Sequence, residues 1–116
     1  MTITRIGVGP RMSKAVVHGN MVYLAGQVAD AAKGKSVTDQ TADILAQIDA
    51  ILKEAGTDKT KLISANIWLA DIKTFAEMNA VWDKWVVQGA TPARATVEAK
   101  LTAPEYTVEI AVIAAR

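Results

Sequence analysis

The two side chains in this sequence best suited to chemistry are an arginine and a glutamate that lie among apolar residues. Arg94 opens the alternating segment 94–101, and Glu109 lies within the apolar segment 106–115. An arginine held by strand backbone offers a rigid fork of N–H donors that matches a carboxylate. A partly desolvated glutamate holds its proton more tightly, which suits a group that positions or deprotonates water. Together they predict a pocket for a small carboxylate.

The same pair also has a purely structural interpretation. The segments that carry Arg94 and Glu109 are joined by a short connection, so we expect the two strands to pair and the two side chains to meet. An ion pair that only stabilises the sheet is compatible with this pattern. Composition does not decide between an ion pair and a shared pocket.

Most other chemistry is disfavoured by composition. The chain has no cysteine and one histidine, His18, which excludes thiolate chemistry and gives no reason to expect a metal site. Thirteen Lys and Arg nearly cancel twelve Asp and Glu, for a net charge of +1, so nucleic acid is not an expected partner. No segment reaches about eighteen uninterrupted apolar residues, so we expect a cytoplasmic protein without a membrane partner.

Hydrophobic periodicity places the expected elements along the first half of the chain. Residues 15–26 predict a β-hairpin around Gly19-Asn20, and residues 2–6 can add an edge strand. Apolar residues at spacings of three and four predict a helix over 38–55, with Thr38 as its cap. Residues 62–70 alternate as a strand does, with Ile63 on its apolar face.

The second half predicts another helix and two strands. Phe75, Met78, Trp82 and Trp85 share one helical face, which favours a core role for both tryptophans over stacking on nucleobases. Thr74 can cap this helix and Gly89 can close it, while 94–101 and 106–115 predict strands.

These elements predict an α+β fold: one domain over 1–116, with a mixed sheet and two helices packed on one face. Both faces of segment 106–115 are apolar, yet two helices can cover only one face of a sheet. We therefore expect the uncovered face to bury itself against another subunit in an obligate oligomer.

Seven short segments, in this order and spacing, resemble the RidA/YjgF family over nearly the whole chain. The pair Pro92-Ala93-Arg94 and Val108-Glu109-Ile110 is the most specific part of the resemblance. The other segments are Gly19-Asn20-Met21, Ala25-Gly26-Gln27, Gln40-Thr41, Asn66-Ile67-Trp68-Leu69-Ala70-Asp71 and Phe75-Ala76-Glu77-Met78-Asn79. The resemblance implies a chorismate-mutase-like subunit in a homotrimer, with a central barrel of sheets and pockets in the clefts between subunits.

The resemblance also implies a site and a reaction. Arg94 matches the arginine that grips the carboxylate of a 2-imino acid, and Glu109 matches the glutamate that helps hold the attacking water. Gly26 and Thr96 match residues that line the pocket through their backbone, and Asn79 falls among the matched substrate-binding positions. No metal or organic cofactor is implied.

This sequence departs from the best-known deaminases of the family at pocket positions. Thr96 stands where they have cysteine, Ala25 where they have serine, and Arg11 or Met12 near their N-terminal tyrosine. The pattern resembles the YoaB-like branch more closely. An Arg11 that reaches the cleft would add a second contact for an anionic ligand.

The leading hypothesis is hydrolytic deamination of reactive enamines and imines, such as those derived from 2-aminoacrylate, to 2-keto acids and ammonia. The alternative is a non-catalytic trimer that binds a small carboxylate or keto acid, which the missing pocket hydroxyls favour. Ribonuclease activity, a third hypothesis, is disfavoured by the near-zero charge.

Overall fold

The computed structural model describes all 116 residues of the chain, and every strand in it belongs to a single sheet. Short 3₁₀ turns at Lys59–Lys61 and Ile72–Thr74 lead into a strand and a helix. The main elements are β1 (Ile3–Ile6), β2 (Ala15–His18), β3 (Met21–Leu24), β4 (Gln27–Val28), α1 (Val37–Glu54), β5 (Leu62–Leu69), α2 (Phe75–Trp85), β6 (Ala93–Glu98) and β7 (Val108–Ala115).

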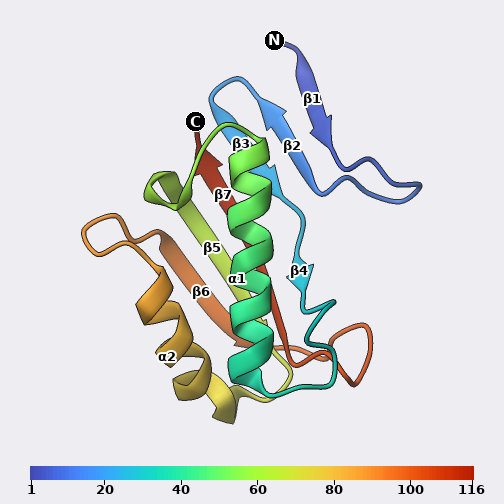
Figure 1. Ribbon diagram of the computed structural model, residues 1–116, viewed down its shortest axis with the longest axis vertical. Helices are drawn as coiled ribbons and strands as arrows, with labels where there is room; N and C mark the ends of the chain where they lie inside the picture. The colour runs from blue at the N-terminus through green and yellow to red at the C-terminus, as the bar shows by residue number, and fades with distance from the viewer.

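The sheet is mixed, with the strand order β1-β2-β3-β7-β5-β6 and with β4 also paired to β7. Only β5 and β6 run parallel, because α2 returns the chain between them as a crossover (Figure 1). The expected direct pairing of the strands that carry Arg94 and Glu109 is therefore wrong, since β5 lies between β6 and β7. The nearly continuous apolar sequence of β7 suits the centre of the sheet, whereas the polar β6 forms an edge.

The hairpin and the N-terminal edge strand are confirmed. β2 and β3 pair antiparallel with His18 opposite Met21, and β1 pairs with β2. Gly19 has a φ of +60°, in the left-handed region that a tight hairpin turn requires and that glycine adopts without strain.

The first helix begins at a different cap from the one expected. Ser36, not Thr38, caps α1, because its side chain accepts the N–H of Asp39 at 3.1 Å. Thr38 instead binds the second helix: its backbone N–H and its hydroxyl donate to Oε2 of Glu77 at 2.9 and 3.0 Å. This contact joins the first turns of α1 and α2.

The second helix also differs from expectation at both ends. Thr74 makes no side-chain cap bond, since its hydroxyl donates to the carbonyl of Asp71. The helix ends at Trp85, four residues before Gly89. Phe75, expected in the core, is 41% exposed, whereas Met78 and Trp82 are buried as predicted.

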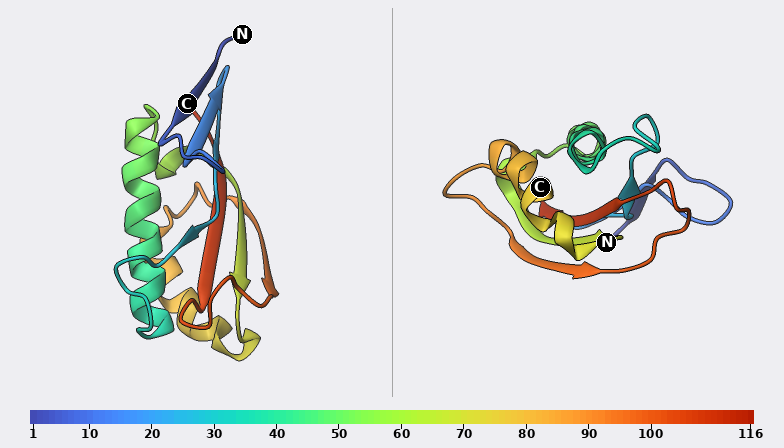
Figure 2. Two further views of the ribbon diagram at one scale, coloured as in Figure 1. Left: turned by 90° about the vertical axis from the view of Figure 1, so that its right-hand side faces the viewer. Right: turned by 90° about the horizontal axis from the view of Figure 1, so that it is seen from below.

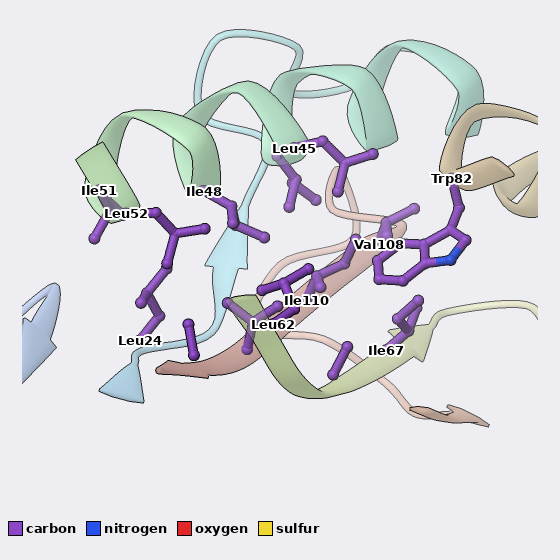
Figure 3. Close-up of a cluster of buried hydrophobic side chains, with 14 of the residues drawn as sticks. Leu24, Leu45, Ile48, Ile51, Leu52, Leu62, Ile67, Trp82, Val108 and Ile110 are labelled. Carbon is purple, nitrogen blue, oxygen red and sulfur yellow. The ribbon is translucent and has the colours of Figure 1, made fainter. Parts of the chain in front are cut away.

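Buried hydrophobic residues form one cluster between the helices and one face of the sheet. Figure 3 shows Leu45, Ile48 and Leu52 of α1 directed toward the sheet. Each such side chain contributes on the order of 1.5–3 kcal/mol when fully buried. Ile63, expected to face inward, is exposed because the β5–β7 register shifts between Leu62 and Ser64.

Both helices lie on the same face of the sheet, as expected, and the opposite face carries no helix (Figure 2). Tyr23 and Val97 lie on this opposite face and are 43% and 50% exposed. Ala111 and Ile113 of β7 continue this surface between them and are half-buried. We call it the open face. No helix has both the length and the apolar composition that a membrane crossing needs.

A buried glutamine holds the start of α1 to the chain before β7. Gln40 is fully buried; its Nε2 donates to the carbonyls of Lys35 and Glu105, and its Oε1 accepts the N–H of Thr107. Gln40→Leu leaves these groups unpaired, so we expect the free energy of unfolding in urea to fall by about 2–4 kcal/mol. Gln47→Leu, which removes one bond to the carbonyl of Val28, should cost about 1 kcal/mol. Equal losses would contradict the role given to Gln40.

Candidate functional site

Arg94 extends from the edge strand β6 toward α2, on the face of the sheet that the helices cover. Its Nη1 donates to Oδ1 of Asn79 at 2.8 Å. Its guanidinium carbon lies 5.7 Å from the ring centre of Phe75 and 5.3 Å from that of Trp82. Positions 75, 79 and 82 are spaced so that they fall on one face of a helix. Three side chains of α2 therefore hold the guanidinium in place.

The guanidinium keeps its charge and one free edge. Burial lowers the pKa of Arg94, and the nearby carboxylate of Asp83 opposes this effect; an arginine stays protonated through such a change. The Nη1–Asn79 bond is the only hydrogen bond of the guanidinium, and Arg94 makes no ion pair. Its Nε and Nη2 donors are therefore available, and this is an edge that can bind a carboxylate through two parallel hydrogen bonds.

Thr96 lies two residues from Arg94 on the same face of β6 and has an unusual hydroxyl. Its Oγ1 is buried and has no hydrogen-bond partner. Ala99 donates its N–H to the carbonyl of Leu69, and ladder bonds fall on alternate residues of an edge strand. This alternation directs the N–H of Thr96 away from β5, next to Arg94.

Glu109 lies on the open face, beside Gly26, which immediately precedes β4. A Cβ placed on Gly26 would be 2.2 Å from Oε2 of Glu109 and 3.0 Å from its carboxyl carbon. The missing side chain of Gly26 is thus the space that the carboxylate occupies. Trp68 of β5 pairs with Glu109 in register and adds an aromatic neighbour on the same face.

The carboxylate of Glu109 is partly desolvated and unpaired. Burial raises the pKa of Glu109, and no hydrogen bond or ion pair satisfies its oxygens. A raised pKa brings a carboxylate closer to the range in which it exchanges protons with a reacting group.

The structure places Arg94 and Glu109 on opposite faces of the sheet, so they form no ion pair within one subunit. Arg94 pairs in register with the buried Ala65, whereas Glu109 pairs with the half-buried Trp68 of the open face. We therefore describe two half-sites. The Arg94 half-site comprises Arg94, Asn79 and Thr96, and the Glu109 half-site comprises Glu109 and Gly26.

Arg11 belongs to neither half-site within the subunit. It is exposed in the loop between β1 and β2, which projects from the edge of the sheet opposite β6 (Figure 1). The largest cavity, about 710 Å³, also lies elsewhere, in the loop between β6 and β7. None of the predicted site residues lines that cavity.

Phe75 and Trp82 are site residues that the sequence reasoning assigned only to the core. Their spacing indicates that both can contact the partner of Asn79, because Asn79 lies between them on the same helical face. The contact with Arg94 also depends on the position of β6 beneath α2, which periodicity alone does not predict.

Comparison with known proteins agrees with this fold. The family profile described as Endoribonuclease L-PSP matches residues 2–116. The chain belongs to this family. It is 46% identical over 117 residues to the RutC family protein YoaB of Escherichia coli K12, covering 99% of each. A RutC family protein of Haemophilus influenzae is 43% identical over 114 residues, covering 98% of each.

Solved structures of the family superpose closely on the chain. A YjgF family member from Neisseria meningitidis has a TM-score of 0.96 at 46% identity, covering all of this chain and 96% of that one. A YjgF/YER057c/UK114 family member from Mycobacterium tuberculosis has a TM-score of 0.89 at 26% identity, covering 99% of this chain and all of that one. The chain therefore has the YjgF-type α+β fold, and the resemblance noted in the sequence is confirmed.

Gly26→Ala should displace the Glu109 carboxylate, because the new methyl group would occupy its place. We expect the substitution to lower the free energy of unfolding by about 1–3 kcal/mol and to reduce any activity that depends on Glu109. In a Glu109→Asp background, where the shorter side chain leaves room, the same substitution should cost much less. Additive stability losses in urea denaturation would contradict the contact.

Proposed function

We propose that this RutC/YjgF-family protein hydrolyses 2-imino acids to 2-keto acids and ammonia. Arg94 holds the substrate carboxylate and Glu109 orients the attacking water. The observation that carries the proposal is the free Nε–Nη2 edge of an Arg94 guanidinium that Asn79 fixes from the other side. Family membership supports a hydrolase only in general terms, because the relatives' names specify no imine substrate.

The two half-sites meet only if two copies of the chain come together. Arg94 lies at the β6 edge and Glu109 on the open face, so a ligand can contact both when the edge of one subunit meets the open face of the next. The exposed apolar residues of the open face supply a reason for such assembly. A closed ring of three subunits, with three identical clefts, is the assembly we propose.

The reaction needs positioning and one proton acceptor. Water adds to the electrophilic carbon of the protonated imine while Glu109 accepts a proton from that water. The resulting tetrahedral carbon bears hydroxyl and amino groups. The amino group takes the proton held by Glu109 and leaves as ammonia, while the hydroxyl loses its proton to solvent and becomes a carbonyl. The outward N–H of Thr96 provides a further donor for the substrate carboxylate.

The test generates 2-iminopropanoate and 2-iminobutanoate in situ with an amino-acid oxidase and traps the remaining imine with semicarbazide. The purified protein should speed the loss of trappable imine and the release of ammonia in equal amounts. No acceleration over buffer with either imine would exclude this activity for these substrates.

The second candidate is a non-catalytic protein that binds a small carboxylate at the same site. It is favoured by Ala25 and Thr96, which stand where the resemblance to the known deaminases leads one to expect serine and cysteine. It predicts keto-acid-dependent stabilisation without turnover. A cytoplasmic location stays a prediction.

A further inference from the structure

Phe75 is exposed beside Arg94, unlike the two buried residues of the same helix. Phe75 is 41% exposed, whereas Met78 and Trp82 of the same helix are 0% and 5% exposed. Figure 3 shows Trp82 directed into the core. Phe75 begins α2, and its ring centre is 5.7 Å from the guanidinium carbon of Arg94. It therefore presents an apolar surface next to the proposed anchor.

A carboxylate bound to the free edge of Arg94 would bring the rest of its molecule close to this ring. In a two-bond pair the carboxyl carbon lies roughly 4 Å from the guanidinium carbon. The ring centre of Phe75 is 5.7 Å from the same carbon, so a ligand side chain of two to four carbons is long enough to contact it. Trp82, which is buried, and Asn79, which is bonded to Nη1, leave Phe75 as the exposed member of the set.

The charges near Arg94 disfavour a second carboxylate on the ligand. Asp83 is the charged group whose field acts on Arg94, and it would repel another anion.

We propose that Phe75 determines specificity by contacting the side chain of the bound acid, so that the site selects 2-imino and 2-oxo acids with apolar side chains of two to four carbons. This inference rests on the proposed function. It adds the residue that contacts the side chain of the ligand and the kind of side chain that this residue favours. A binding surface of this kind gains about 0.8 kcal/mol, or about fourfold in affinity, for each methylene that it buries.

The test measures equilibrium binding of stable 2-oxo acids to the intact oligomer by titration calorimetry. The series is pyruvate, 2-oxobutanoate, 2-oxopentanoate and 4-methyl-2-oxopentanoate, with 2-oxoglutarate as the dianion. Wild type should bind about two- to fourfold more tightly for each added carbon and should bind 2-oxoglutarate less well than 2-oxopentanoate. Phe75→Ala should flatten the series, so that it weakens binding of 4-methyl-2-oxopentanoate much more than binding of pyruvate, and Phe75→Leu should restore part of the slope.

The possible results distinguish failure of the specificity role of Phe75 from failure of the proposed function. A uniform loss for all acids in Phe75→Ala would mean that the ring only positions Arg94, and an unchanged slope would mean that it contacts no ligand; either result overturns the specificity role. Failure of wild type to bind any acid, or wild-type binding by Arg94→Ala, would overturn the proposed function as well. If Phe75→Ala does not assemble, Phe75→Leu and Phe75→Met measured against the same series give the same decision.

Discussion

Replacing Arg94 with alanine should reduce the rate of imine hydrolysis by about 10²–10³-fold, because two charge-assisted hydrogen bonds to the substrate carboxylate are lost. Arg94→Lys keeps the charge but not the fork, so it should recover only part of the rate. The measurement is kcat/KM in the semicarbazide-trapping assay, with the thermal midpoint recorded to confirm folding.

Arg116→Ala is the matched control for removal of a surface arginine. Arg116 is exposed at the C-terminus, and its backbone N–H and its Nε donate to the carbonyls of Asn20 and Gly19 in the β2–β3 turn. It should retain wild-type kinetics. Full activity of Arg94→Lys would show that a point charge suffices and would contradict anchoring by a fixed fork.

Replacing Glu109 with glutamine should lower kcat by about 10²–10⁴-fold, the usual contribution of a general base, with little change in the affinity for 2-oxo acids. Burial raises the pKa of Glu109, so activity of wild type should fall on acidification at a higher pH than an ordinary glutamate would give. Glu54→Gln, at the exposed end of α1, is the control and should leave both the rate and the pH profile unchanged.

Glu109→Gln should be more stable than wild type even though it should be less active. Because the pKa of Glu109 is raised in the folded state, the folded protein binds more protons than the unfolded chain between the two pKa values. Stability therefore falls as the pH rises through that interval. At neutral pH Glu109→Gln should be more stable than wild type, and the difference should disappear below the unfolded pKa. A destabilised glutamine variant at neutral pH would contradict the unpaired state of this carboxylate.

The elements were predictable because their signals are local. The 3.6-residue period of α1, the glycine at the β2–β3 turn and the apolar run of β7 each depend on residues close together in the chain. The face of each strand was harder to predict, since one register shift at Leu62 turned Ile63 outward.

The site residues were predictable as types but not as an arrangement. Arg94 and Glu109 were singled out as charged groups among apolar neighbours, yet their strands were expected to pair. Strand order depends on the crossover through α2 and on which strand takes the centre of the sheet, and neither has a local signature. The contacts of Arg94 with Phe75 and Trp82 follow from that order.

The central claim is that the active cleft takes Arg94 from one subunit and Glu109 from the next, and subunit mixing tests it most directly. Arg94→Ala and Glu109→Gln chains, each inactive alone, would be co-expressed with different tags, and mixed oligomers would be isolated by sequential affinity steps and confirmed by native mass spectrometry. Each isolated mixed ring of three subunits has one cleft, about a third of its clefts, that combines an intact Arg94 with an intact Glu109. We predict that the isolated mixed oligomers recover roughly a third of wild-type activity. Mixed oligomers with no recovered activity would contradict a cleft shared between subunits.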